Sequence, residues 1–233
     1  MKEYLTKCLD KMELACTEEQ MEQFEAYHRL LAEWNEKMNL TAICEPQEVA
    51  LKHFADCLYG VRYLPEGASL IDVGSGAGFP GVPLKIMRPD LKVLLLDSLN
   101  KRILFLEELI RCLGLSDIRA LHSRAEDGAK GELRETFDAA AARAVANLSV
   151  LSEYCLPYVK VGGCFLAYKG SAGAEEIAAA KNALHTLGAR LEKQDEYVLP
   201  DSDMQRTLAV IRKERHTPAK YPRNAGQIAK KPL

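Results

Sequence analysis

The segment IDVGSGAGFPG at residues 71–81 is the strongest indication of the fold class of this chain. It overlaps a short apolar strand, SLIDV at 69–73, and is followed by a segment with helical character, PGVPLKIM at 80–87. Three alternating glycines, Gly74, Gly76 and Gly78, join the two. Glycine has no side chain, so a ligand can approach the backbone closely there. The stretch therefore predicts a strand, a ligand-binding loop and a helix that begins with proline, where a missing N–H costs least.

Strands and helices alternate along the chain after this loop. We expect strands at 69–73, 92–97, 117–122, 137–144, 162–170, 190–199 and 205–213, and helices at 80–87, 100–114, 149–159 and 172–188. Repeated alternation predicts an α/β fold, a mostly parallel seven-stranded sheet with helices on both faces. Ligands of such sheets bind beyond the carboxyl ends of the strands, near the switch in strand order.

The N-terminal segment carries helical patterns of its own. A short amphipathic helix is expected at 1–16, and Thr17 with Gln20 resembles a capping box that opens a second helix. Apolar residues recur there at helical spacing and form one packing face: Phe24, Tyr27, Leu31, Trp34 and Met38. A further helix is expected at 49–61. We therefore expect a helical extension at 1–64, a Rossmann-like domain at 65–213 and a basic tail at 214–233.

Two cofactor classes compete for the glycine loop. GAGFPG at 76–81 formally matches the dinucleotide pattern GxGxxG, which favours an NAD-dependent oxidoreductase. Counted from Gly74, however, the third glycine position holds Phe79. A dinucleotide also needs free N–H groups at the helix start for its pyrophosphate, and Pro80 and Pro83 remove two of them. S-adenosylmethionine has no phosphate, so we favour a class I S-adenosylmethionine-dependent methyltransferase over the NAD enzyme and over a turn without a ligand.

Residues at the ends of other strands complete the predicted site. Asp97 ends the second strand, where an acid accepts hydrogen bonds from both ribose hydroxyls of an adenosine. Ala125 and Glu126 follow the third strand and are placed to meet the adenine. Arg143 and Lys169 end the fourth and fifth strands, where each faces the cleft and can approach a phosphate or the acceptor edge of guanine.

The sequence assigns no catalytic residue. It contains no GxSxG, GxxxxGK[ST] or HExxH motif, no Asn-Pro-Pro-aromatic signature and no obvious base. Methylation of a ring nitrogen that has a free lone pair requires no prior deprotonation. Catalysis can then depend on proximity, alignment and electrostatics, and guanine N7 is such a nucleophile.

Composition and charge bound the possible functions. The 233 residues include seven cysteines at irregular spacing and no long apolar run, which predicts reduced thiols and a cytoplasmic protein without a signal peptide. Net charge is −2 overall, yet residues 206–233 contain eight Lys or Arg and one acid. This asymmetry is typical of an acidic body with a phosphate-seeking end, although charge alone also fits a solvated tail.

Several segments together carry a family resemblance: WNEKMNLTAI at 34–43, HFADCL at 53–58, IDVGSGAGFPGVPLKI at 71–86, LLLDSLNKRILFLEEL at 94–109, SRAED at 123–127, RAVANL at 143–148, YKG at 168–170 and YPRNAGQIAKKPL at 221–233. They resemble the RsmG (GidB) family of bacterial small-subunit ribosomal RNA guanine-N7 methyltransferases. The resemblance covers nearly the whole chain in order. It implies an S-adenosylmethionine donor and methylation of guanine 527 of 16S rRNA.

The resemblance also implies site residues. Its cofactor contacts carry over to Gly74, Phe79, Ala125, Glu126 and Arg143, to which the fold argument adds Ser75, Gly76, Gly78 and Asp97. Charge and position suggest RNA contacts at His53, Arg102, Arg124, Lys169, Arg206, Arg223, Lys230 and Lys231, with Arg212 and Lys213 as further candidates. The expected partner is 16S rRNA or the 30S subunit or its precursor, with a monomeric chain, no metal and no membrane. A non-catalytic RNA-binding or assembly factor remains the third hypothesis.

Overall fold

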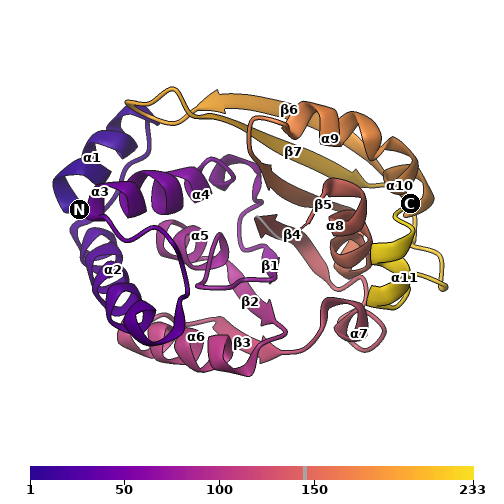
Figure 1. Ribbon diagram of the computed structural model, residues 1–233, viewed down its shortest axis with the longest axis horizontal. Helices are drawn as coiled ribbons and strands as arrows, with labels where there is room; N and C mark the ends of the chain where they lie inside the picture. Colours follow the sequence, from indigo (N-terminus) through magenta and orange to yellow (C-terminus); the bar gives the residue numbers. More distant parts are fainter. Residues whose placement is uncertain (144–145) are drawn as a thin grey trace.

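A seven-stranded sheet forms the centre of the molecule. The computed structural model describes residues 1–143 and 146–233 (Figure 1). The strands are β1 (Ser69–Val73), β2 (Lys92–Asp97), β3 (Ile118–His122), β4 (Phe137–Arg143), β5 (Val159–Lys169), β6 (Ala189–Val198) and β7 (Gln205–Lys213). Their order is β3-β2-β1-β4-β5-β7-β6. The first five are parallel, whereas β7 runs antiparallel to both β5 and β6. The predicted mostly parallel, Rossmann-like sheet is confirmed.

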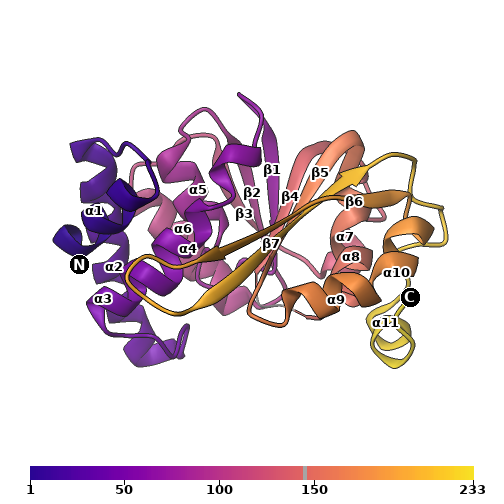
Figure 2. The same cartoon turned by 90° about the horizontal axis from the view of Figure 1, so that it is seen from above.

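Helices cover both faces of this sheet. In the N-terminal third they are α1 (Lys2–Lys11), α2 (Glu18–Met38), α3 (Pro46–Val49), a π-helix (Ala50–Ala55), α4 (Asp56–Leu58) and a 3₁₀-helix (Val61–Tyr63). The later helices are α5 (Gly81–Met87), α6 (Asn100–Cys112), α7 (Ala125–Gly128), α8 (Leu148–Cys155), a 3₁₀-helix (Leu156–Tyr158), α9 (Gly173–Ala179), α10 (Lys181–Thr186) and α11 (Ala225–Lys230). Figure 2 shows α1 to α6 on one side of the sheet and α7 to α11 on the other.

Alternating side chains of the strands supply two hydrophobic cores. Successive residues of a strand point to opposite faces. Leu70 of β1 thus belongs to the core under α1, α2, α5 and α6, and its neighbour Ile71 to the core under α7 to α10. The N-terminal helices therefore share one continuous core with the sheet.

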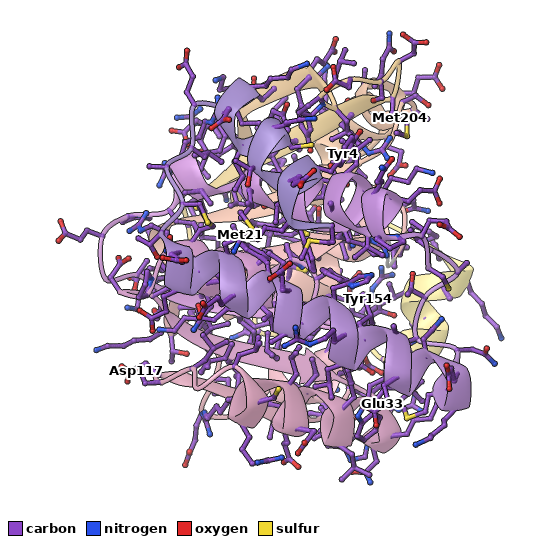
Figure 3. The ribbon with its side chains drawn as sticks, turned by 90° about the vertical axis from the view of Figure 1, so that its left-hand side faces the viewer. Tyr4, Met21, Glu33, Asp117, Tyr154 and Met204 are labelled. Carbon is purple, nitrogen blue, oxygen red and sulfur yellow. The ribbon has the colours of Figure 1, made fainter. Side chains whose placement is uncertain are left out.

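The second helix begins as its sequence predicts. The Thr17 hydroxyl accepts from the N–H of Gln20, and the Gln20 side chain accepts from the N–H of Thr17. Of the predicted apolar stripe, Phe24, Tyr27 and Leu31 are buried against the core, while Trp34 and Met38 are half-buried. Figure 3 shows α1 and α2 as the outermost layer on this side, with Tyr4 and Met21 on them.

Several element boundaries differ from those expected. The helix expected at 172–188 is two helices, α9 and α10, which are separated at Ala180, whose ψ is −1°. The helix expected at 49–61 starts at Pro46 and contains a six-residue π-helical segment. The strand expected from 162 begins at Val159. The alanine-rich β4 ends at Arg143, and Ala144 of the expected strand lies outside the described residues.

The C-terminal segment packs on the body of the protein. Tyr221 and Ile228 are buried, and α11 contacts α8. Arg134 donates to the carbonyls of Thr217 and Tyr221, at 2.7 and 2.8 Å. The tail is therefore docked instead of freely solvated.

All seven cysteines are free thiols, as the sequence predicts. In the described part of the chain, no helix has the length and hydropathy that a membrane span requires.

Candidate functional site

A cavity of ≈ 960 Å³ opens at the carboxyl ends of the strands. Residues from the ends of four parallel strands line it: Gly74 after β1, Asp97 of β2, Arg143 of β4 and Lys169 of β5. The strand order reverses between β1 and β4, so the cavity lies at the predicted switch point. Its volume is at the upper end of the usual range for ligand sites, about 300–1,000 Å³.

The glycine loop forms one wall of this cavity. Gly74, Gly76 and Gly78 all have positive φ, at 77°, 59° and 97°. The need for glycine is greatest at Gly78, where a Cβ would lie 2.7 Å from the Tyr27 hydroxyl oxygen. That hydroxyl donates to the carbonyl of Ala77 at 2.5 Å. Helix α2 therefore holds the loop in place from behind.

Backbone N–H groups around the start of α5 are used within the protein. Those of Gly78 and Phe79 donate to the Ser75 carbonyl. The N–H of Gly81 donates to the buried Asp72 carboxylate at 2.8 Å, and that of Val82 donates to Gly78. Pro80 and Pro83 have no N–H to offer. The helix start thus lacks the free donors that a pyrophosphate needs, which argues against a dinucleotide.

Asp97 joins the loop to the second strand. Its carboxylate is 3% exposed, and it accepts from the N–H groups of Gly76 and Leu99, each at 2.9 Å, and from Arg102 at 3.2 Å. A carboxylate has about four acceptor positions, so one remains for a further donor such as a ribose hydroxyl. An adenosine ligand that lacks phosphate therefore fits this wall.

A stack of side chains in this cavity adjoins the glycine loop. The ring centroids of His53 and Phe79 are 4.4 Å apart, and the Arg143 guanidinium lies 4.9 Å from the Phe79 centroid. Arg143 also donates to the Lys52 carbonyl at 2.8 Å and to His53 Nδ1 at 2.9 Å. Burial, with the nearby Arg143 charge, lowers the pKa of His53 to about 3, so the imidazole is neutral.

Asp56 organises two arginines of the cavity. Its carboxylate is buried, with Arg143 at 3.3 Å and Arg206 at 3.5 Å from Oδ2. The hydroxyl of Tyr197 donates to Oδ1 at 2.9 Å. A buried carboxylate between two guanidinium groups holds both of them in place. The three groups together carry one net positive charge.

The cavity as a whole is positively charged. Five Lys or Arg and three Asp or Glu line it, a surplus of two, although the chain carries −2. Lys169 pairs with Glu176 at 2.7 Å and donates to the Ala146 carbonyl at 2.6 Å. Arg143 and Lys169, which we expected to face the cleft, both line this cavity. Its net positive charge suits a phosphate or the acceptor edge of a base.

The structure brings together most of the predicted site residues but not all of them. The cavity is lined by Gly74, Ser75, Gly76, Phe79, Asp97 and Arg143 of the predicted cofactor set and by His53, Arg102, Lys169 and Arg206 of the predicted RNA set. Gly78, Ala125, Glu126 and Arg124 lie outside its lining. Ser123, which precedes them, donates its N–H to the Asp97 carbonyl at 3.1 Å, so this turn adjoins the site. Their roles stay predictions.

The tail residues lie apart from the cavity, in different environments. Arg223 pairs with the fully buried carboxylate of Glu153, at 2.6 Å. Lys213 is buried beside Glu135 at 3.0 Å, and Arg212 pairs with Glu192 at 2.7 Å. Lys230 and Lys231 are exposed. Arg223 is thus engaged in packing the tail, and its predicted RNA contact stays a prediction.

Sequence reasoning missed several residues of the cavity. Thr41, Asp56, Ser98, Tyr168 and Glu176 all line it. Thr41 and Asp56 come from the N-terminal extension, which reaches the site through tertiary packing. Both residues lie in segments that resemble the family, Thr41 in 34–43 and Asp56 in 53–58, and this resemblance was the feature of the sequence that could have indicated them.

Related proteins match most of the length of this chain. The family described as rRNA small subunit methyltransferase G (GidB) matches residues 20–204. A "Ribosomal RNA small subunit methyltransferase G" of Clostridium perfringens is 49% identical over 232 residues, 98% of this chain and 97% of that relative. One of Alkaliphilus metalliredigens is 52% identical over 217 residues, 92% of this chain and 91% of that relative.

Solved structures share the fold at low sequence identity. A SAM-dependent methyltransferase from Aquifex aeolicus has a TM-score of 0.55 at 20% identity, covering 77% of this chain and 97% of that one. The TYW2 protein of M. jannaschii, solved with AdoMet, has a TM-score of 0.57 at 14% identity, covering 74% and 79%. At these identities the likenesses show a shared fold.

Proposed function

The chain belongs to the rRNA small subunit methyltransferase G family, and from that membership we propose that it methylates N7 of a guanine in 16S rRNA, guanine 527. Its cofactor is S-adenosylmethionine, which supplies a methyl group on a positively charged sulfur. The observation that carries the proposal is one cavity with two kinds of wall: a phosphate-free cofactor wall and a positively charged acceptor wall.

The cofactor wall consists of the glycine loop and Asp97. The positive-φ glycines let a ligand approach the backbone, and Asp97 retains acceptor capacity for a ribose. We assign Gly74, Ser75, Gly76 and Phe79 to this wall, with Ala125 and Glu126 in the adjoining turn toward the adenine.

The acceptor wall consists of His53, Arg143, Lys169 and Arg206. Their position beside the loop supports a role in holding the target nucleotide, with Arg102 and Arg124 at the rim. Arg143 and Arg206 are fixed by Asp56, so their charges are oriented before the RNA arrives. Preoriented charge reduces the reorganisation that binding and reaction require.

The state of the titratable groups supports transfer without a general base. The acceptor nitrogen of His53 is taken by Arg143, and Asp56 is taken by two arginines and Tyr197. The lone pair of guanine N7 is available without deprotonation. We infer that the chain accelerates in-line displacement by holding donor and base close together in an aligned geometry.

Methyl transfer from labelled S-adenosylmethionine tests this function. The acceptors are naked 16S rRNA, 30S particles lacking the modification, and fully modified 30S particles. We expect incorporation into an unmodified acceptor, none into modified particles, and chain cleavage at guanine 527 under conditions specific for N7-methylated guanine. Incorporation at another position or equal incorporation into modified particles would contradict the proposal.

A further inference from the structure

The loop between α2 and α3 places one hydroxyl at the cavity. Asn39 ends α2 with left-handed backbone, and the Thr41 N–H donates to the Asn35 side-chain oxygen at 2.8 Å. The Thr41 hydroxyl oxygen accepts from the N–H of Ile43 at 3.0 Å. Thr41 is half-buried and lines the cavity. Its side chain is therefore held in one position.

A chain of hydrogen bonds fixes the polarity of this hydroxyl. Arginine has donors and no acceptor, so His53 Nδ1 must accept the bond from Arg143. The neutral imidazole then carries its proton on Nε2. That nitrogen lies 2.9 Å from the Thr41 hydroxyl oxygen, so it donates to Thr41.

Both lone pairs of the Thr41 hydroxyl are consequently occupied. One accepts from Ile43 and the other from His53. A hydroxyl has two lone pairs and one proton, and it can usually accept or donate by rotating. Here the proton alone remains free, so Thr41 can act toward a ligand only as a donor.

A hydroxyl that can only donate distinguishes guanine from adenine, whereas a hydroxyl that is free to donate or accept does not. Guanine and adenine both have N7, and they differ beside it: guanine has an exocyclic oxygen acceptor, and adenine has an amino donor. We propose that the Thr41 hydroxyl selects guanine by donating to that oxygen, and that Arg143 and His53 enforce this selection by preventing Thr41 from accepting an amino proton.

The placement of Thr41 supports this reading. A hydrogen bond of 2.9 Å joins Thr41 to His53, and the His53 ring stacks on Phe79 with 4.4 Å between centroids. Phe79 directly follows the glycine loop, so the hydroxyl and the cofactor wall face one cavity. The inference rests on the proposed function, because it concerns the base at that same site.

Atomic substitution of the target base tests the proposal. The acceptors are 30S particles reconstituted with guanine, inosine or 2,6-diaminopurine at position 527 of the 16S rRNA. Inosine keeps the exocyclic oxygen, whereas diaminopurine replaces it with an amino group. We expect the wild-type chain to methylate guanine and inosine at similar single-turnover rates and diaminopurine at least about tenfold more slowly, since a donor would then face a donor.

Two variants separate donation from polarity. Thr41→Val removes the hydroxyl and should slow guanine methylation about tenfold or more, with Thr41→Ser close to wild type. His53→Phe keeps a ring against Phe79 but frees one Thr41 lone pair, so the diaminopurine-to-guanine rate ratio should rise several-fold. Thr6→Val, the same change on exposed α1, is the matched control.

The outcomes distinguish this inference from the proposed function. If the wild-type chain leaves every guanine N7 unmodified, the proposed function fails. If it methylates guanine but His53→Phe leaves the ratio unchanged, the polarity argument fails. Nitrogen NMR of the folded wild-type chain gives a second readout: we expect the Nε2–H tautomer of His53, and an Nδ1–H tautomer would overturn the inference even if the variants do not fold.

Discussion

At the scale of single residues, two buried carboxylates that accept from the glycine loop and the start of α5 have different surroundings. Asp97 accepts from two backbone N–H groups and from Arg102, and it faces the cavity. Asp72 is fully buried and accepts from Gly81 through one oxygen, while its other oxygen has no hydrogen-bond partner. Each carboxylate oxygen of Asp97 therefore has a hydrogen-bond partner, whereas one oxygen of Asp72 has none.

Replacement of Asp97 should weaken cofactor binding. Asp97→Ala removes the acceptor offered to the ribose and releases the Gly76 N–H, so we expect S-adenosylmethionine affinity to fall at least about tenfold, the value of one or two hydrogen bonds to a charged group. Isothermal titration calorimetry measures this, with Asp117→Ala, a replacement of an exposed acid before β3, as control. Unchanged affinity would remove Asp97 from the site.

Burial raises the pKa of Asp72 to about 7, and this has a consequence for stability. In the unfolded chain an aspartate titrates near its usual pKa of about 3.9. Between these values the folded state binds more protons, so the Asp72 contribution falls as pH rises from about 4 to 7. Asp72→Asn does not ionise. Its unfolding free energy relative to wild type should therefore improve by about 3 kcal/mol between about pH 4.5 and 7.

Urea denaturation at the two pH values measures this difference. Comparison with the wild type at each pH cancels the contributions of other titrating groups. A relative stability of Asp72→Asn that does not depend on pH would show that Asp72 titrates normally in the folded protein.

At the scale of elements, α2 packs against the glycine loop and supports its conformation. The Tyr27 hydroxyl donates to the Ala77 carbonyl, and its ring stacks on Phe79 at 5.3 Å between centroids. Helix α2 lies on the outer side of α5, away from the sheet (Figure 2). The N-terminal extension is therefore part of the site's support.

Removal of the Tyr27 hydroxyl tests that support. Tyr27→Phe leaves the Ala77 carbonyl without this donor, so we expect a loss of about 1–2 kcal/mol in unfolding free energy and a several-fold weaker S-adenosylmethionine affinity. Tyr4→Phe, on the outer helix α1, is the matched control. Wild-type cofactor affinity in Tyr27→Phe would show that the loop holds its conformation without α2.

The order of the strands along the chain, and the residues that lie at the end of a single strand, could be predicted from the sequence. The loop, Asp97, Arg143 and Lys169 could be predicted because a parallel sheet fixes where strand ends lie. Thr41 and Asp56 could not, since their position depends on how separate helices dock. The break at Ala180 was also missed, because local pattern does not fix where a helix changes direction.

At the scale of the whole molecule, the C-terminal segment combines an anchor and a free end. The Glu153 carboxylate is fully buried and receives the backbone N–H and guanidinium of Arg223. Lys230 and Lys231 beyond it are exposed. The charge asymmetry of the sequence therefore divides into a structural part and a part available to phosphate.

Separate neutralisation of these two parts should give different results. Arg223→Ala leaves a buried carboxylate without its partner, so we expect a loss of about 3 kcal/mol in unfolding free energy. Lys230→Ala with Lys231→Ala should leave stability unchanged and reduce the slope of log K against log salt for 16S rRNA binding by about 1–2. An unchanged slope would exclude these two lysines from RNA contact.

We propose that the whole cavity joins a cofactor wall to an acceptor wall for methyl transfer to guanine N7. The most direct measurement is mass spectrometry of the nucleosides released from 30S particles after reaction with methyl-labelled S-adenosylmethionine. We predict one labelled 7-methylguanosine per particle, and its loss with Asp97→Ala. Label in a 2′-O-methyl, carbon-methylated or exocyclic-amine product would contradict the claim.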